Sequence, residues 1–181
     1  MRVYTLYIFI VLTLALSGCS QKKNKEITKI DQPEVSRLDS MVPPKPIGWV
    51  ADYEGILTSS QVMYLDSLIS DHEKKTSNEV AIVTMVLDST QIVSDEDLNE
   101  ISLSLFNKWR FGKEDKNNGI GMLVSTNLKK TRIEVGRGLE TKLANHEAKD
   151  IIEINMIPEF RKGDYYTGIL NGLLAIFREI K

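Results

Sequence analysis

Two glycine-containing loops carry the polar side chains whose types and spacing could support chemistry. They span residues 112–119 and 136–140, and the candidate residues are Glu114, Asp115, Asn117, Asn118, Arg137 and Glu140. Carboxylate and amide oxygens together form the ligand set of a hard cation such as Ca²⁺ or Mg²⁺. Arg137, with Glu140 nearby, could instead contact an anion or a partner protein. A solvated approach to a hairpin has the same composition, so a binding site and a plain polar loop are both open.

The two loops can form one site only if the segments between them fold as a hairpin. The apolar run 120–124 has the character of a buried strand, and residues 131–135 alternate, with Glu134 between two apolar positions. Residues 127–130 supply a polar turn. An antiparallel pair joined by this turn brings both loops to the same end of the sheet. The site hypothesis therefore depends on this hairpin.

The rest of the chain predicts an α/β fold. A hydroxyl cap at Thr58 or Ser59 precedes a helical stripe of apolar residues, and Ser94 caps a second helix that has acids in its first turn. Between them, residues 79–86 form a β-branched run typical of a strand buried on both faces. Two further helices follow the hairpin, the first ended by Pro158. With a right-handed strand–helix–strand crossover, this order predicts a three-layer α/β/α sandwich with a small mixed β-sheet.

The first 18 residues have the pattern of a bacterial export signal. Arg2 precedes an uncharged, mostly apolar run over residues 3–16, which is too short to span a bilayer as a mature helix. The run ends in Leu-Ser-Gly-Cys, which resembles the bacterial lipobox and implies lipid modification of Cys19 after cleavage of residues 1–18. An uncleaved anchor or an ordinary secretory signal is the alternative. Because Cys19 is the only cysteine, no disulfide can form within the chain.

Residues 19–46 are predicted to be the lipidated cysteine and a flexible tether, and residues 47–181 the folded domain. Lysines near the start of the tether and prolines towards its end disfavour regular structure. This organisation predicts a lipid-anchored, periplasm-facing protein of the cell envelope. Ser20 stands where an aspartate is often linked to retention in the inner membrane, which favours the outer membrane.

Composition and motif searches exclude several functional classes. The chain has 25 acidic and 23 basic residues, so it lacks the basic footprint of a nucleic-acid-binding protein. It contains neither a Gly-x-x-x-x-Gly-Lys-Ser/Thr phosphate loop nor a Gly-x-Ser-x-Gly nucleophile elbow. His72 and His146 have no zinc-binding spacing, and His72 continues an apolar stripe, so we expect it to pack at a helix end. No catalytic residue can be assigned.

Six short motifs, in order, resemble the TPM-domain family, whose plant members are thylakoid-lumen phosphatase-like proteins. The motifs lie at residues 49–58, 79–86, 105–113, 117–120, 132–140 and 157–169. One of them, Arg-Ile-Glu-Val-Gly-Arg-Gly-Leu-Glu, is close to the family's Arg-Ile-Glu-Val-Gly-Tyr-Gly-Leu-Glu. The resemblance covers nearly the whole predicted domain. It implies an α/β/α sandwich, and the export signal makes the chain resemble a bacterial lipoprotein member of the family.

The resemblance also implies a divalent-cation site in some members, formed by an aspartate-containing loop and an aspartate of the opening motif. Carried over to this chain, it points to Asp52, Asn118 and Asn117. Asn117 replaces the usual aspartate and removes one negative charge, which weakens an ion site unless Asp115 substitutes for it. Arg137 replaces the family's usual aromatic residue and adds a positive charge, which leaves room for an anionic partner.

Two functions follow from this resemblance and from the residues. The family is associated with an accessory role in maintaining membrane protein complexes and with weak acid-type phosphatase activity. The tether, the lipid and the missing nucleophile–base pair favour an envelope accessory factor, with a membrane protein as partner and Ca²⁺ or Mg²⁺ as the expected cation. The alternative is a metal-dependent acid-type phosphatase acting on phosphomonoesters, because a preorganised charge cluster can stabilise a transferring phosphoryl group.

Overall fold

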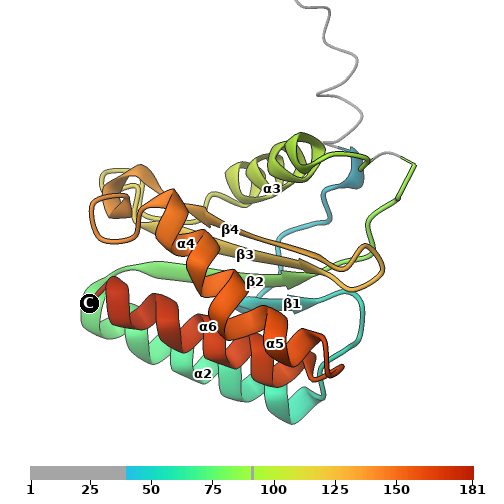
Figure 1. The fold of residues 1–181 in the computed structure, drawn as a ribbon. Coiled ribbons are helices and arrows are strands. Elements are labelled where there is room, and N and C mark those ends of the chain that lie inside the picture. Colours follow the sequence, from blue (N-terminus) through green and yellow to red (C-terminus); the bar gives the residue numbers. More distant parts are fainter. Residues whose placement is uncertain (1–39, 91) are drawn as a thin grey trace, which may run out of the picture. The chain divides into compact units, whose positions relative to one another are not determined.

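The computed structural model describes residues 40–90 and 92–181. The predicted signal segment 1–18, Cys19 and most of the predicted tether therefore lie outside the described residues. The described chain forms a four-stranded mixed sheet with helices packed on both faces (Figure 1). The predicted α/β/α sandwich is confirmed.

The sheet has the strand order β1-β2-β3-β4. β1 (Val50–Asp52), β2 (Glu79–Thr84) and β3 (Gly119–Ser125) run parallel, and β4 (Lys130–Val135) is antiparallel to β3. The predicted hairpin is therefore confirmed as β3 and β4. β1 was not predicted, because three residues are too few for a periodic pattern to be recognised.

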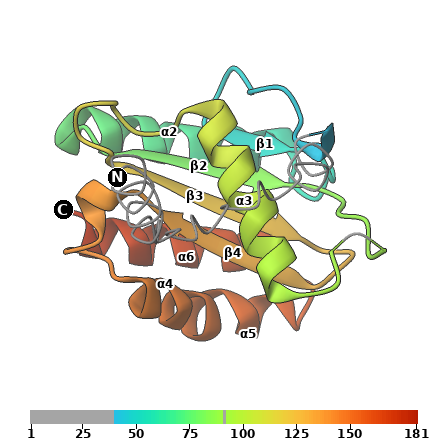
Figure 2. The same ribbon diagram turned by 90° about the horizontal axis from the view of Figure 1, so that it is seen from above.

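Helices cover both faces of the sheet, with α3 lying across one of them (Figure 2). The helices whose bounds lie within the described residues are, in chain order, α2 (Ser59–Thr76), α3 (Asp95–Trp109), the 3₁₀ turn η1 (Arg137–Leu139), α4 (Asn145–Ile151), the π-helix η2 (Ile152–Met156), α5 (Ile157–Phe160) and α6 (Tyr165–Glu179). α3 packs on the face that carries Ala81 and Val83 of β2. α2, α4 and α6 share the core over Val80 and Ile82. No helix within the described ranges is long and apolar enough to cross a membrane.

Side-chain caps determine where α2 and α3 begin. The hydroxyl of Thr58 accepts a hydrogen bond from the backbone N–H of Gln61, and the Gln61 side chain accepts one from the N–H of Thr58. Ser94 and Asp97 form the same arrangement at the start of α3. These reciprocal bonds satisfy N–H groups that have no partner inside the helix. The predicted cap at Ser94 is confirmed, and of the two predicted alternatives Thr58 and Ser59, the cap is Thr58.

The two connections between parallel strands have opposite handedness. The steps from β1 to β2 and from β2 to β3 go in the same direction across the sheet, but α2 and α3 lie on opposite faces. Two right-handed crossovers would place both helices on one face. The right-handed crossover expected from the general rule therefore holds for only one of the two connections.

The helix that begins with α4 continues through the π-helix η2 into α5 and does not end at Pro158. The N–H of Ile157 donates to the carbonyl of Ile152, five residues back, which closes the π-helix η2. Pro158 then lies in the first turn of α5, where its missing N–H removes no helical hydrogen bond. The prediction that Pro158 ends the helix was wrong, because proline is compatible with the start of a new helical turn.

Residues 42–45, predicted as part of the tether, contact the folded domain. Val42 is buried in the core on the α3 side of the sheet. The indole N–H of Trp109 donates to the carbonyl of Pro43 at 2.8 Å. The contacts of the folded part therefore begin at Val42 or earlier, before the predicted start at residue 47.

His72 of α2 packs against Phe177 of α6. The two rings are stacked with centroids 4.0 Å apart, and Nε2 of His72 is buried without a hydrogen-bond partner among the described residues. Burial, and in second place the charge of Lys75, lower the pKa of His72 below its ordinary value of 6.5. The expected packing of His72 is thus present, and it disfavours the charged imidazolium.

We expect the free energy of unfolding to fall as the pH decreases below about 6.5, and part of this fall to be absent in His72→Phe. The unfolded chain binds a proton at this histidine at a higher pH than the folded chain does. Stability that is present above the unfolded-state pKa is therefore lost as the pH falls through the lowered folded-state pKa. Urea unfolding at several pH values measures the slope, and an identical slope in the variant contradicts this account.

Candidate functional site

The two predicted loops lie side by side at one end of the β3–β4 hairpin. The N–H of Gly136 donates to the carbonyl of Gly119 at 2.8 Å, and the N–H of Gly138 donates to the carbonyl of Asn117 at 3.0 Å. A Cβ atom on Gly138 would lie 1.9 Å from the carbonyl oxygen of Lys116, so this approach requires glycine. The predicted proximity of the two loops is confirmed for their backbones.

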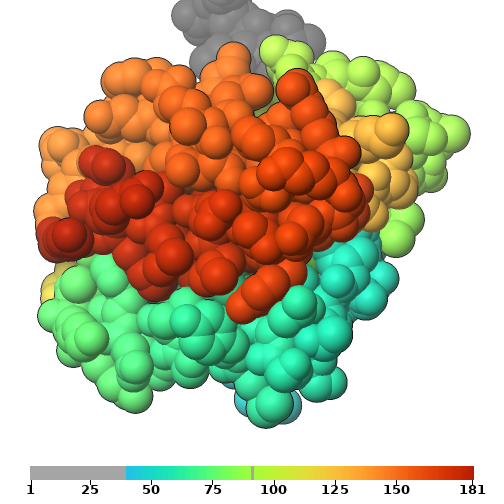
Figure 3. Space-filling view, turned by 60° about the horizontal axis from the view of Figure 1, so that its bottom comes forward, coloured from blue at the N-terminus to red at the C-terminus, as the bar shows by residue number. Residues whose placement is uncertain are grey.

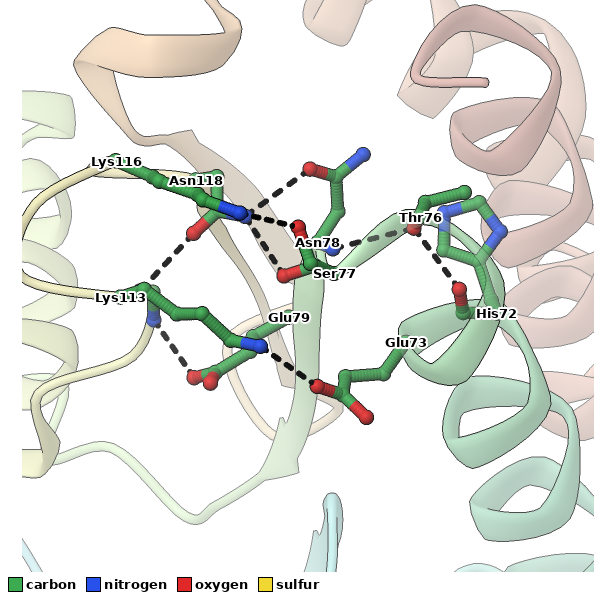
Figure 4. Close-up of polar contacts among 10 residues, drawn as sticks. His72, Glu73, Thr76, Ser77, Asn78, Glu79, Lys113, Lys116 and Asn118 are labelled. Atoms are coloured by element: carbon green, nitrogen blue, oxygen red, sulfur yellow. Dashed lines mark hydrogen bonds and ion pairs between the residues drawn. The ribbon is translucent and has the colours of Figure 1, made fainter.

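Asn118 is a buried polar residue at this end, and its side chain connects three segments (Figure 4). It is 4% exposed. Its Oδ1 accepts from the backbone N–H of Lys113 at 2.9 Å, and its Nδ2 donates to the carbonyl of Ser77 at 2.7 Å and to Oδ1 of Asn78 at 3.2 Å. We call these four residues the Asn118 clip. The amide of Asn118 is therefore occupied by hydrogen bonds within the fold.

Charged side chains reinforce the Asn118 clip. Lys113 forms an ion pair with Glu73 of α2 at 3.1 Å. Glu79, the first residue of β2, accepts a hydrogen bond from the backbone N–H of Gly112 at 2.9 Å. These contacts join the loop before β3 to the end of α2 and the start of β2, so the buried polar groups at this end stabilise the fold.

The other candidates at this end are exposed. They are Glu114, Asp115, Asn117, Arg137 and Glu140. Within the described part of the chain, Asp115, Arg137 and Glu140 form no ion pair and no side-chain hydrogen bond. These side chains are free to meet a ligand, but no contact of the fold holds them in one geometry.

Asp52 lies at the opposite end of the sheet from Asn118. Asp52 pairs with Thr84, and Thr84 pairs with Val124 near the end of β3, whereas Asn118 precedes the first residue of that strand. The distance along β3 from Asn118 to Val124 is roughly 20 Å. The predicted set of cation ligands, Asp52 with Asp115, Asn117 and Asn118, therefore does not form one site. Because β1 and β3 are parallel, the end of β1 and the start of β3 lie at opposite ends of the sheet.

The carboxylate of Asp52 organises the turn that leads into α2. Its Oδ2 accepts from the backbone N–H of Leu57 at 2.8 Å, and its Oδ1 accepts from the N–H of Ile56 at 3.2 Å. Oδ1 also accepts a hydrogen bond from the buried hydroxyl of Thr84. Three donors within the fold thus use both oxygens, which accounts physically for an aspartate followed by a helix cap in the opening motif.

The donor set does not fit a divalent cation well. Among residues 40–90 and 92–181, no three His, Cys, Asp or Glu side chains are grouped as metal ligands. With Asp52 at the other end and Asn118 occupied, Asp115 and Asn117 are the exposed oxygen donors that the predicted set retains. Ca²⁺ and Mg²⁺ sites use six or more oxygens, including several charged ones or waters. A strong site would need ligands that the fold does not bring here.

A basic groove along β4 was missed by the sequence reasoning. Two pockets of about 320 and 530 Å³ share Lys129, Lys130, Thr131 and Ile157. We call them together the β4 groove, and its charged lining is Asp95, Lys129, Lys130, Arg132, Lys149, Glu153 and Arg161. The sequence signal was the basic cluster at the start of β4. It becomes a groove because residues of α3, α4, η2 and α5 pack beside the strand, and Figure 2 shows α4 and α5 on this side of the sheet.

Comparisons with known proteins agree with this fold. A sequence model described as the TPM domain matches residues 50–179. The chain is similar to the N-terminal domain of a protein from P. gingivalis, with 29% identity, a TM-score of 0.64, and 81% of this chain and 86% of that chain covered. No match was found among the curated proteins.

Two more distant solved structures share the fold. The BA42 protein from Bizionia argentinensis is 18% identical with a TM-score of 0.57, and the comparison covers 71% of this chain and 83% of that one. The N-terminal domain of the cg2496 protein from Corynebacterium glutamicum is 12% identical with a TM-score of 0.55, covering 77% and 84%. At these identities the likeness concerns the fold alone.

Proposed function

This chain belongs to the TPM-domain family, and from that premise we propose that it is a non-catalytic accessory or maintenance factor for membrane protein complexes of the cell envelope. A lipid on Cys19 holds the protein at the membrane, with the outer membrane favoured and the domain facing the periplasm. Residues 1–39 lie outside the described residues, so the support for this anchor is the lipobox-like sequence.

One observation carries the non-catalytic part of the proposal. Asp52 and Asn118, which the family resemblance implicates in a site, bind backbone and side-chain groups of their own fold at opposite ends of the sheet. Groups used in this way are not free to bind a phosphomonoester or its metal. In this proposal Ca²⁺ or Mg²⁺ has a minor role, because Asp115 and Asn117 offer one negative charge between them.

We expect cross-linking in intact cells to join the full chain to a discrete membrane protein, and Cys19→Ala to abolish this product. The lipid confines the domain to the membrane surface, which raises its effective concentration near a membrane partner. Affinity purification of cross-linked envelopes followed by mass spectrometry measures the product. Ser20→Ala keeps the lipidated cysteine and is the matched control, which should retain the cross-link.

A phosphatase assay gives the contradicting outcome. The purified full chain is incubated with an aryl phosphomonoester and with Mg²⁺, Mn²⁺ or Ca²⁺. Metal-dependent turnover that disappears in Asp115→Asn would replace the accessory function with a phosphatase. Asp115 is exposed and has no side-chain partner in the described chain, so this substitution removes a charge without disturbing the fold. Turnover that is equal in both proteins reports a contaminant.

A further inference from the structure

β4 is an edge strand whose outward backbone groups follow from the register. The N–H of Met85, which follows β2, donates to the carbonyl of Val124 at 3.1 Å, so the backbone groups of Val124 point towards β2 and not towards β4. Residues of an antiparallel ladder alternate between bonded and non-bonded pairs. Thr131, the partner of Val124, therefore directs its N–H and C=O away from the sheet, and so do Ile133 and Val135.

These outward groups leave a free edge on the described chain. The backbone groups of Thr131, Ile133 and Val135 have no hydrogen-bond partner among residues 40–90 and 92–181. The opposite edge differs, because Asp66 of α2 accepts the N–H of Val50 in β1 at 3.0 Å. A free edge is a template for an added strand.

The β4 groove provides space for such a strand. Its two pockets run along β4, with Thr131 in both and Ile133 in the smaller one. The walls beside the strand come from α3 on one side and from α4, η2 and α5 on the other. In Figure 3 the orange-red atoms of the segment after residue 150 lie beside the amber atoms of the segment around the turn between β3 and β4, and residues of both segments line the larger pocket. β4 is six residues long, and an added strand of about six residues, roughly 20 Å, would match it.

The charge of the β4 groove selects the kind of strand. Five of its side chains are basic and two are acidic, although the whole chain has a net charge of −2. Lys130 is paired with Asp95, and Arg132 is paired with Glu134. Three exposed cations form no ion pair within the described ranges, namely Lys129, Lys149 and Arg161.

We propose that the β4 edge binds an acidic, extended segment of an envelope protein, which adds a strand to the sheet. This inference rests on the proposed accessory function and names the class of its partner. Main-chain hydrogen bonds to Thr131, Ile133 and Val135 supply affinity, and the three free cations select acidic side chains. A second copy of β4 fits less well, because pairing two such edges brings like charges opposite each other.

The test measures binding of two fluorescent decapeptides to the full chain in detergent by fluorescence polarisation. One peptide alternates glutamate with valine, and the other alternates lysine with valine. Both carry valine at alternate positions, so the sign of the charge is the main difference between them. We expect the glutamate peptide to bind at least about tenfold more tightly, which corresponds to about 1.4 kcal/mol.

Thr131→Pro tests the strand pairing. Proline lacks the outward N–H but is tolerated on an edge strand when that N–H faces away from the sheet, so we expect about tenfold weaker binding of the glutamate peptide. Thr131→Val is the matched control. It keeps the N–H and loses only the hydroxyl bond to the carbonyl of Leu123, so its affinity should equal that of the unchanged protein.

Lys149→Glu tests the charge and covers the case in which Thr131→Pro does not fold. Lys149 is exposed on α4 and lines the β4 groove. We expect this charge reversal to lower the affinity for the glutamate peptide about fivefold, and we expect the effect to diminish at high salt. Lys75→Glu makes the same charge change on α2, outside the groove, and should leave binding unchanged.

Each opposite outcome overturns a defined part of the proposal. Equal affinity of Thr131→Pro and Thr131→Val refutes strand addition, and equal affinity for the two peptides refutes acidic selection. A concentration-dependent dimer that Thr131→Pro abolishes assigns the edge to a second copy instead. If the full chain still cross-links a membrane protein but does not bind the glutamate peptide, this inference fails while the accessory function stands.

Discussion

Asn118→Asp should lower the free energy of unfolding by about 3 kcal/mol at neutral pH, or the melting temperature by roughly 10 °C. The new carboxylate has no hydrogen to donate, so the carbonyl of Ser77 and Oδ1 of Asn78 both lose their donor and face a negative charge. Because Asn118 is 4% exposed, water cannot replace the lost hydrogen bonds.

The loss of unfolding free energy caused by Asn118→Asp should be smaller at acidic pH. A protonated carboxyl group can donate to the carbonyl of Ser77, which restores one bond of the Asn118 clip. Burial and the two acceptor oxygens raise the folded-state pKa of the new group, so stability relative to the unchanged protein recovers as the pH falls through that pKa. Urea unfolding at about pH 7 and about pH 4 measures the difference between the two proteins.

Asn117→Asp is the matched control for this prediction. The residue is adjacent and exposed, its φ of 48° is one that aspartate tolerates, and the change restores the charge that the family resemblance implies. We expect it to alter stability by less than about 0.5 kcal/mol. If Asn118→Asp were stabilised by Ca²⁺ over the unchanged protein, Asn118 would be a cation ligand and the Asn118 clip would be the wrong account.

The elements that the sequence predicted correctly depend on local interactions. Thr58 and Ser94 each cap a helix through a partner three residues later, and such spacing is visible in the chain. The hairpin of β3 and β4 likewise joins neighbouring segments through a short turn. These signals were enough for the three-layer architecture, because one buried strand, one hairpin and amphipathic helices leave few arrangements.

The elements that were missed depend on contacts between distant segments. β1 has three residues and exists because it pairs with β2, so its own sequence carries little strand signal. Without β1, the position of Asp52 relative to Asn118 could not be deduced. Once β1 is known to be parallel to β3, the placement of both residues at opposite ends follows directly from the register.

The role of Asn118 also depends on contacts with residues distant in the sequence. Asn118 was predicted as a ligand because its residue type and neighbours suit a cation, but its amide is used by Ser77 and Asn78, about forty positions earlier in the chain. The β4 groove is the opposite case, because it was not predicted from the sequence but is present in the structure. Basic residues of β4 are unremarkable in sequence, and they become a surface only when Lys149 and Arg161 are packed beside them.

Asp52→Asn should lower the free energy of unfolding by about 2–3 kcal/mol. The amide is isosteric, but it replaces one acceptor oxygen with an NH₂ group that opposes a backbone N–H. If the NH₂ group replaces Oδ2, the N–H of Leu57 loses its acceptor. If it replaces Oδ1, the N–H of Ile56 and the hydroxyl of Thr84 lose theirs. Thermal unfolding followed by circular dichroism measures the loss, and Asp115→Asn, the same change at an exposed residue without a side-chain partner, should leave stability nearly unchanged.

The same variant separates a structural role of Asp52 from a functional one. Asp52 is not part of the β4 groove, so the folded fraction of Asp52→Asn should bind the glutamate peptide with unchanged affinity while its melting temperature falls. The opposite pattern, unchanged stability with a loss of Ca²⁺ binding or of metal-dependent turnover, would make Asp52 a ligand. Because loss of acceptors at a turn and loss of a ligand act on different measurable quantities, one substitution decides between them.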